Sequence, residues 1–231
     1  MVSANQEVRM AGMIEYAANG GTAHGYLAGE GNARGIIVIQ EWWGLAPHIK
    51  DVADRFAAAG YVALAPDLWD GKLTKAPDEA QRLFMALNID DAGKKLRGAA
   101  AALRARGATG KLAVIGFCMG GALALFAAAA MPEDIGACIT FYGGHPAVKP
   151  AYASLKAPVL GVYGEADGSI TPAVARAIEK KILDAGGRCE THIYPAPAGH
   201  AFFNDARPEA YHEASAKDAW QKTLAFLDRS L

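Results

Sequence analysis

The pentapeptide Gly116-Phe117-Cys118-Met119-Gly120 constrains the fold of this chain more than any other feature. It stands between an apolar run of strand length, residues 112–115, and an alanine-rich run of helical character, residues 121–130. In that setting, a G-x-C-x-G turn predicts a nucleophile elbow, a tight strand-to-helix turn that exposes a reactive side chain. The elbow residue adopts a strained backbone, and side chains at the flanking glycines would collide with the neighbouring strand or helix. Cys118 is therefore predicted to be a nucleophile, in a position where serine is more usual.

Apolar runs of strand length alternate with stretches of helical spacing along the rest of the chain. Strands are predicted at 35–40, 61–65, 111–115, 137–141, 158–163 and 189–194, and helices at 48–59, 77–87, 90–106, 121–131, 172–185 and 211–231. Two N-terminal segments, 8–17 and 22–28, are joined by Asn19-Gly20-Gly21, a turn signal that predicts a β-hairpin. This alternation predicts an α/β fold with a doubly wound, mostly parallel sheet flanked by helices. No linker or repeat interrupts the sequence, so one domain is expected over 1–231.

Composition argues against several classes of function. Lys and Arg total 23 and Asp and Glu total 24, so neither a nucleic-acid-binding surface nor an acidic tail is expected. No apolar run suits a signal peptide or a membrane span. The 3 cysteines include no C-x-x-C pair, which argues against a disulfide scaffold or a structural zinc site and favours a reducing cytoplasm. We expect no cofactor and no metal, and a monomer or a small homo-oligomer.

A cysteine nucleophile needs a base to hold it as thiolate, and the base needs an acid to orient it. In the order nucleophile, acid, base, the candidates are Asp167, which follows the predicted strand 158–163, and His200, which follows the last predicted strand. Loops after parallel strands meet at the carboxyl edge of the sheet, so these side chains are expected near Cys118. Glu165 is an alternative acid, but Asp167 is favoured because a residue later in the loop reaches that edge more easily.

The remaining histidines and cysteines have simpler interpretations. His192 lies inside an alternating strand pattern, where an exposed surface position is expected. The others lie in a hairpin, a helix start, a loop and a helix, without the spacing of metal ligands: His24, His48, His145 and His212. Cys138 is expected to be an inert core residue, and Cys189 is expected to be structural.

Backbone N–H groups are expected to form the oxyanion hole. One belongs to Met119, directly after the nucleophile, and the other is assigned to Trp42 in the loop after the first central strand. Glu41 begins that loop. Its carboxylate is either a solvated loop charge or a second partner for the thiol.

These residues resemble the dienelactone hydrolase family, carboxymethylenebutenolidase-like enzymes of the α/β-hydrolase superfamily. The resemblance runs from about Gly20 to the C-terminus and rests on Gln40-Glu41-Trp42-Trp43-Gly44, Ala65-Pro66-Asp67-Leu68, Gly116-Phe117-Cys118-Met119-Gly120-Gly121, Tyr142-Gly143, Gly164-Glu165-Ala166-Asp167 and Gly199-His200-Ala201-Phe202. It implies a triad of Cys118, Asp167 and His200. It also implies that Glu41 hydrogen-bonds the resting thiol until substrate displaces it, which would limit oxidation of an exposed thiolate. Residues expected to contact substrate by this resemblance are Trp43, Tyr142 and Phe202.

The chain departs from the family pattern where dienelactone-specific members use arginines to hold the substrate carboxylate. One of these arginines stands four residues past the catalytic histidine, where this chain has Asn204. The other aligns with Pro77, with Arg82 nearby but displaced, and Arg207 is a further stand-in. We expect Asn204 and Arg82 in the substrate site, a weaker hold on a carboxylate, and a preference shifted towards neutral esters or lactones.

The combined prediction is a cofactor-independent hydrolase that acts on a small-molecule lactone or activated carboxylic ester through a thioester intermediate. Enol-lactones suit a thiol nucleophile because their leaving group is a stabilised enolate. A general carboxylesterase or thioesterase with the same triad is one alternative. Another is a non-catalytic binding protein with a redox-sensitive Cys118, although such a protein would not need Asp167 and His200 in order.

Overall fold

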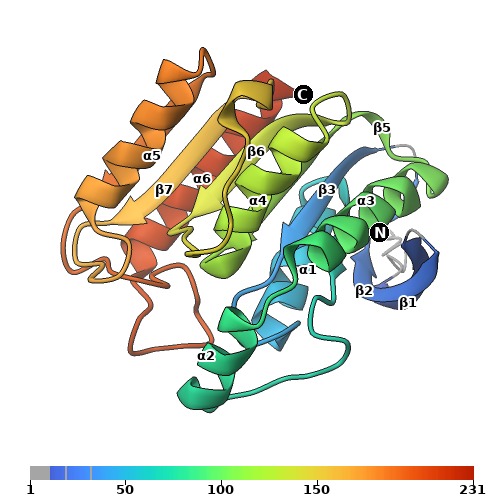
Figure 1. Cartoon of the computed structure of the whole chain (residues 1–231), viewed down its shortest axis with the longest axis horizontal. Helices are drawn as coiled ribbons and strands as arrows, with labels where there is room; N and C mark the ends of the chain where they lie inside the picture. The colour runs from blue at the N-terminus through green and yellow to red at the C-terminus, as the bar shows by residue number, and fades with distance from the viewer. Residues whose placement is uncertain (1–10, 19, 32) are drawn as a thin grey trace, which may run out of the picture.

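An eight-stranded sheet forms the centre of the computed structural model, which describes residues 11–18, 20–31 and 33–231 (Figure 1). Along the sheet the strand order is β1-β2-β4-β3-β5-β6-β7-β8. The bounds are β1 Ala11–Ala18, β2 Gly21–Ala28, β3 Arg34–Ile39, β4 Tyr61–Pro66, β5 Thr109–Phe117, β6 Ile135–Phe141, β7 Val159–Gly164 and β8 Cys189–Tyr194. Strands β3 to β8 pair in parallel, whereas β1 and β2 form an antiparallel hairpin at one edge. The predicted doubly wound, mostly parallel sheet with an N-terminal hairpin is confirmed.

Helices cover both faces of this sheet. Their bounds are α1 Pro47–Ala58, α2 Pro77–Met85, α3 Ile89–Ala105, α4 Met119–Ala130, α5 Pro172–Asp184 and α6 Glu213–Ser230, with a short 3₁₀ turn at Tyr152–Ser154. Helices α3, α4 and α5 contribute to one core cluster, for example through Leu96 and Leu123. Helices α1 and α6 contribute to the other, for example through Ile49 and Phe226. Figure 1 shows these two groups on opposite sides of the sheet, with α2 lying beyond its lower end.

The central strand β3 shows why the strands could be found in the sequence. Ile36 and Val38 belong to one core cluster, and Ile37 and Ile39 belong to the other. Successive side chains of a strand point to opposite faces, so a strand covered on both sides is apolar at every position. Such a strand appears in the sequence as a continuous apolar run.

The strand order places the candidate site. The chain crosses from β3 to β4 on one side, and then crosses back over β3 to reach β5 on the other side. The loops that follow β3 and β5 therefore lie next to each other at the carboxyl edge of the sheet. Ligands of open α/β sheets bind at such a switch point. Glu41 follows β3 and Cys118 follows β5, so the topology alone brings these two residues to the same place.

Element boundaries differ from the predictions by about two residues, and local hydrogen bonds explain part of the difference. Helix α4 begins at Met119 because the elbow passes directly into the helix. Helix α2 ends at Met85, and the Asn88 side chain caps the start of α3 by accepting hydrogen bonds from Asp90 N and Asp91 N, both at 3.1 Å. Residues 8–10 and 19 of the predicted hairpin lie outside the described residues.

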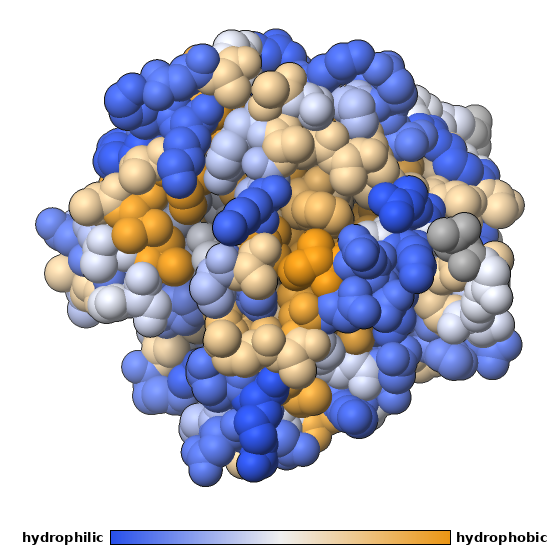
Figure 2. All heavy atoms as spheres, in the orientation of Figure 1, coloured by the Kyte–Doolittle hydropathy of each residue, from blue (hydrophilic) through white to orange (hydrophobic). Residues whose placement is uncertain are grey.

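The last features of the fold are the polarity of its surface and the character of its helices. On the face shown in Figure 2, hydrophilic residues occupy much of the area and hydrophobic residues lie between them. None of the helices within the described ranges has both the length and the apolar character that crossing a membrane requires.

Candidate active site

Cys118 sits at the tip of a strained turn between β5 and α4. Its backbone dihedrals are φ 54° and ψ −119°, a combination that non-glycine residues rarely adopt. A Cβ atom at Gly116 would overlap the carbonyl oxygen of Gly120, and one at Gly120 would overlap the carbonyl oxygen of Ile39. The Cys118 amide donates to Phe141 O at 3.0 Å, which ties the turn to the sheet. The structure thus gives the two elbow glycines the steric role that the sequence predicts.

Asp167 and His200 meet at the same edge of the sheet. His200 Nδ1 lies 2.7 Å from Asp167 Oδ2, and the other carboxylate oxygen accepts hydrogen bonds from Ser169 N at 2.7 Å and Ile170 N at 2.8 Å. Burial disfavours the Asp167 carboxylate, but the hydrogen bond and charge of His200 outweigh it and hold the pKa of Asp167 below its usual value. Asp167 is therefore a fixed anion that selects one orientation of the imidazole.

His200 also interacts with the nucleophile. Burial disfavours the charged imidazolium, yet hydrogen bonds with Asp167 and with Cys118 raise the pKa of His200 to about 10. Because Nδ1 is engaged by Asp167, the ring nitrogen that remains for Cys118 is Nε2. Glu165, the alternative acid, has another partner: its Oε2 accepts a hydrogen bond from Ala196 N at 3.0 Å.

Glu41 is buried beside the nucleophile, with 3% of its surface exposed. Its Oε2 accepts a hydrogen bond from Asn204 Nδ2 at 2.8 Å, and its Oε1 has no partner among the described residues. The buried Tyr142 lies close by: burial and the Glu41 carboxylate raise the pKa of its hydroxyl, which makes no hydrogen bond of normal geometry within the described chain. In this structure Asn204 is the hydrogen-bond partner of Glu41, and no hydrogen bond joins Glu41 to Cys118 within the described chain.

The oxyanion hole predicted from the sequence consists of the backbone amides of Met119 and Trp42. Met119 is the first residue of α4, where an amide has no acceptor within the helix. Neither amide donates a hydrogen bond to any other described residue. The loop that carries Trp42 is held by its carbonyl groups: Trp69 Nε1 donates to Trp42 O at 3.1 Å, and Thr74 N donates to Trp43 O at 3.1 Å. These bonds fix the loop and leave the Trp42 amide free.

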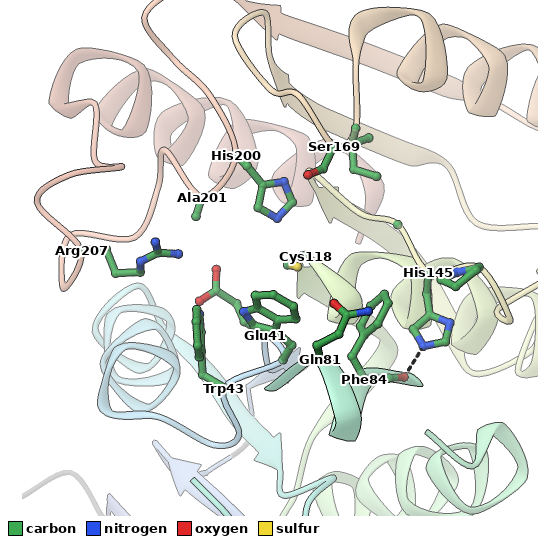
Figure 3. A pocket seen from close by; sticks show the side chains of 14 residues that line it. Glu41, Trp43, Gln81, Phe84, Cys118, His145, Ser169, His200, Ala201 and Arg207 are labelled. Atoms are coloured by element: carbon green, nitrogen blue, oxygen red, sulfur yellow. Dashed lines mark hydrogen bonds between the residues drawn. The ribbon is translucent and has the colours of Figure 1, made fainter. Parts of the chain in front are cut away.

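A pocket of about 410 Å³ opens in front of Cys118 (Figure 3). Its wall is mostly apolar and aromatic, and its polar groups come from a few side chains: the lining residues are Glu41, Trp42, Trp43, Gln81, Phe84, Cys118, Gly144, His145, Pro146, Ser169, Ile170, His200, Ala201 and Arg207. An apolar pocket with a few convergent polar groups is the usual form of a small-molecule site. The pocket brings Cys118, His200 and Glu41 together in one cavity.

A family model described as "Dienelactone hydrolase family" matches residues 23–231, which is most of the chain. The chain belongs to the dienelactone hydrolase family. The family places this protein among the carboxylic ester hydrolases, and the resemblance seen in the sequence motifs is confirmed.

Individual relatives of this family member are similar over nearly their whole length. "Protein usf" of Aquifex pyrophilus is 33% identical over 96% of this chain and 100% of its own. The "Putative carboxymethylenebutenolidase" of Saccharolobus solfataricus is 34% identical over 94% of this chain and 97% of its own. The crystal structure of "Putative Dienelactone Hydrolase" from Klebsiella pneumoniae superposes with a TM-score of 0.86 at 31% identity, covering 95% of this chain and 98% of that one. The fold is the α/β-hydrolase fold.

Of the residues expected to contact substrate in this dienelactone hydrolase family member, some line the pocket and others do not. Trp43 lines the pocket, as expected. Tyr142 and Phe202 are fully buried and pack on each other, with ring centroids 5.9 Å apart, so they support the wall from behind. Asn204 is also buried: besides its bond to Glu41, its Oδ1 accepts from Ala206 N at 3.1 Å. Arg82 is exposed on α2 and does not line the pocket.

Other pocket residues were not predicted from the sequence. Helix α2 turns Gln81 and Phe84 towards the pocket, since residues three apart share a helix face. His145 is part of the wall: its Nε2 lies 2.8 Å from Phe84 O, as Figure 3 shows, and its Nδ1 accepts from Ala147 N at 3.0 Å. Arg207, considered in the sequence only as a stand-in, lines the pocket with its guanidinium 5.5 Å from the Trp43 ring centroid.

Proposed function

We propose that this protein hydrolyses lactones or activated carboxylic esters, with Cys118 as nucleophile, His200 as general base and Asp167 as the acid that orients the base. His200 holds the proton of the thiol while the sulfur attacks the carbonyl carbon of the ester. The amides of Met119 and Trp42 stabilise the negative charge that develops on the carbonyl oxygen.

The proposed intermediate collapses by expelling the alcohol oxygen, which takes a proton from His200, and a thioester remains on Cys118. Water then attacks the thioester with His200 as base, the carboxylic acid leaves, and the thiol is restored. A thiolate is itself a good leaving group, so the first collapse proceeds forward best when the alcohol also leaves readily. The enol of an enol-lactone meets that condition.

The hydrogen bond between His200 and Asp167 carries the proposal, because it connects residues 33 positions apart and orients a histidine that lines the same pocket as Cys118. A binding protein with no catalytic role would not need a buried carboxylate to orient a histidine beside a thiol. The mostly apolar pocket also limits competition from water during the lifetime of the thioester.

Acyl-enzyme trapping tests the proposal. The protein is mixed with dienelactone and with 4-nitrophenyl acetate, quenched rapidly, and analysed by intact mass and peptide mapping. We expect the acyl group on Cys118, and no acylation or turnover in Cys118→Ala. Cys138→Ala and Cys189→Ala are matched controls that keep turnover within about twofold. An active Cys118→Ala enzyme, or an acyl group on another residue, would contradict the thioester mechanism.

We further propose that Glu41 influences how readily the thiol loses its proton, because its carboxylate shares the pocket with Cys118 and has an unpartnered oxygen among the described residues. Glu41→Gln keeps the shape of the side chain and removes the charge. We expect a changed pH profile for alkylation of Cys118 by iodoacetamide and a lower kcat. Profiles and turnover identical to wild type would reduce Glu41 to a buried acceptor for Asn204.

The sequence predicts a preference for neutral esters or lactones, but because Arg207 lines the pocket we propose instead, for the substrate, a lactone that carries a free carboxylate near Arg207. The Nε of Arg207 donates to Glu209 at 2.9 Å, while its Nη1 has no hydrogen-bond partner within the described ranges. The guanidinium lies against Trp43 at the pocket wall. A substrate carboxylate can bind there even though Asn204, at the position of the family's arginine, is occupied by Glu41. Relatives named as carboxymethylenebutenolidases support the same substrate class.

A further inference from the structure

A polar network connects Glu41 to the first helix of the fold. Asn204 donates from Nδ2 to Glu41 at 2.8 Å. The next residue, Asp205, lies 3.3 Å from Nδ1 of His48 in the first turn of α1, and it also pairs with Arg55 on the same helix. Two consecutive residues of one loop therefore hold Glu41 on one side and α1 on the other.

His48 occupies an unusual position for an ionisable side chain. Only 2% of its side chain is exposed, and its ring lies 6.2 Å from the ring of Phe117 and 6.3 Å from that of Phe203. Phe117 directly precedes Cys118 in the chain, and Phe203 directly precedes Asn204. The ring thus packs against the neighbours of both the nucleophile and the residue that holds Glu41.

The hydrogen bond to Asp205 defines the tautomer of His48. Burial disfavours the Asp205 carboxylate, but the hydrogen bond with Arg55 outweighs it and lowers the pKa of Asp205, which can then only accept. Nδ1 of His48 therefore carries the proton that is donated to Asp205. Its Nε2 is then an acceptor that is buried and has no partner in the described part of the chain. Oε1 of Glu41 is likewise buried without a partner there.

The charges around His48 come from every element that packs on it. Burial lowers the pKa of His48, the carboxylates of Glu41 and Asp205 oppose that effect, and Arg55 adds to it. Asp51 lies on the same helix, and its carboxylate has a ligand atom within 4.8 Å of those of His48 and Asp205. That spacing would suit a cation, but the Arg55 guanidinium already pairs with both carboxylates. The cluster is therefore an ion-paired anchor for the network.

We propose that His48 is a positioning residue for Glu41: through Asp205 it fixes the loop that places Asn204 on the Glu41 carboxylate, and its own charge changes the field that Glu41 experiences. This inference rests on the proposed role of Glu41 beside Cys118. At neutral pH the neutral ring holds Asp205 through Nδ1–H. When the ring takes up a proton from solvent at lower pH, a positive charge appears inside the protein on the side of Glu41.

Two variants of His48 separate position from charge. His48→Asn can keep a donor near the place of Nδ1 but cannot titrate, whereas His48→Phe keeps a ring and loses the donor. His24→Asn is the matched control, since His24 is an exposed histidine paired with Glu15 on the edge hairpin. For each protein, kcat and KM for 4-nitrophenyl acetate and the rate of Cys118 alkylation by iodoacetamide are measured from about pH 5 to pH 9.

For His48→Asn, which keeps the donor, we expect kcat and KM close to wild type at neutral pH. We also expect it to lose an inflection that the wild type shows below about pH 6.5, in both the kinetic and the alkylation profiles. For His48→Phe, which loses the donor to Asp205, kcat should fall about tenfold with little change in KM, since small misplacements of catalytic groups have effects of that size or larger. His24→Asn should match wild type.

A His48→Asn profile that superimposes on wild type in both measurements would overturn the inference, whatever its kcat. If no ester is hydrolysed by the wild type, the proposed function fails, but the alkylation profiles still decide whether His48 controls the environment of Cys118. If His48→Phe does not fold, His48→Asn alone provides the answer.

Discussion

Cys118 has a backbone conformation that most side chains avoid, and its neighbours explain why it persists. The strand before it and the helix after it are both buried, and the glycines on either side allow close approach of backbone to backbone. Strain of this kind remains only where the surrounding structure over-determines it. In return, the half-buried Cys118 lines the pocket at the N-terminus of α4, where the helix dipole favours a negatively charged group.

Substitutions in the proposed triad should lower kcat by different amounts. His200→Ala should lower kcat by about 10³-fold or more, because both proton transfers depend on it. Asp167→Asn should lower kcat by less, because Asp167 only orients and stabilises the base. Glu165→Gln is the matched control and should stay within about twofold of wild type, since Glu165 bonds Ala196 N instead of His200. Steady-state kinetics on 4-nitrophenyl acetate measures all three, and an inactive Glu165→Gln beside an active Asp167→Asn would reverse the assignment of the acid.

Arg207 predicts a difference between charged and neutral substrates. A charge-assisted hydrogen bond contributes about 1.5–3 kcal/mol, which corresponds to roughly ten- to a hundredfold in kcat/KM. Arg207→Gln should therefore lower kcat/KM for dienelactone by that factor and leave a neutral lactone of similar size nearly unchanged. Arg82→Gln, on the exposed side of α2, is the control and should change neither value. Equal losses on both substrates in Arg207→Gln would show that Arg207 shapes the wall without binding a carboxylate.

At the scale of elements, β5 and α4 are joined so closely that one added methyl group would lower the stability of the fold. A Cβ at Gly120 would overlap the carbonyl oxygens of Ile39 and Gln40, which are backbone atoms of β3 and its loop and cannot rotate away. Overpacking of this kind destabilises by about 1–3 kcal/mol. Gly120→Ala should therefore lower the Tm by roughly 2–12 °C, at about 2–4 °C per kcal/mol for a chain of this size. Thermal unfolding monitored by circular dichroism measures the change.

Gly12→Ala is the matched control for that substitution, because a Cβ at Gly12 on the edge strand meets nothing within 4 Å. Its Tm should stay within about 2 °C of wild type, given that one kcal/mol shifts the Tm by roughly that amount. A Gly120→Ala protein as stable and as active as Gly12→Ala would show that the elbow can relax.

The same elements show what could be predicted from the sequence. Buried parallel strands such as β3 are continuous apolar runs, so their positions and their alternation with helices are visible without any structure. The order of Cys118, Asp167 and His200, each after a strand, follows from that alternation because the ends of parallel strands meet at one edge. The family pattern added Glu41 and Trp43.

The rest of the pocket depends on where whole elements lie, which local patterns do not contain. Sequence alone selected Arg82 on α2, yet the rotation of that helix brings Gln81 and Phe84 to the cavity and leaves Arg82 outside. Asn204 was expected to face substrate, but its amide matches the carboxylate of Glu41 once the two loops meet. Contacts between residues 163 positions apart arise only from the tertiary fold.

At the scale of the whole molecule, the titration of Asp167 and His200 makes the free energy of unfolding depend on pH. The folded-state pKa of Asp167 is depressed, so its stabilising contribution is present above its unfolded-state pKa of about 3.9 and is lost as the pH falls through the folded value. The folded-state pKa of His200 is raised, so its contribution is fully present below about pH 6.5 and is lost as the pH rises through about 10.

The directions of the two pKa shifts predict that the protein is most stable between the acid range, where Asp167 loses its contribution, and the alkaline range, where His200 loses its contribution. The urea midpoint of wild type should fall below about pH 4, and it should also fall progressively between about pH 6.5 and about pH 10. Asp167→Asn should be less stable than wild type at neutral pH and should flatten the acid limb, while His200→Ala should flatten the alkaline limb. An acid limb with the same slope in Asp167→Asn as in wild type would show that other carboxylates, such as Asp205, dominate it.

The segment from His200 to Arg207 carries the proposed base, the residue that holds Glu41, the anchor to α1 and the cation at the pocket wall. The proposed catalytic and substrate-binding roles in this enzyme therefore depend on one segment. An insertion or a shift in these eight positions would disturb all of these roles at once. Helix α2 contributes only wall residues such as Gln81 and Phe84. A mutant library aimed at new substrates should therefore diversify α2 and leave the segment after β8 untouched.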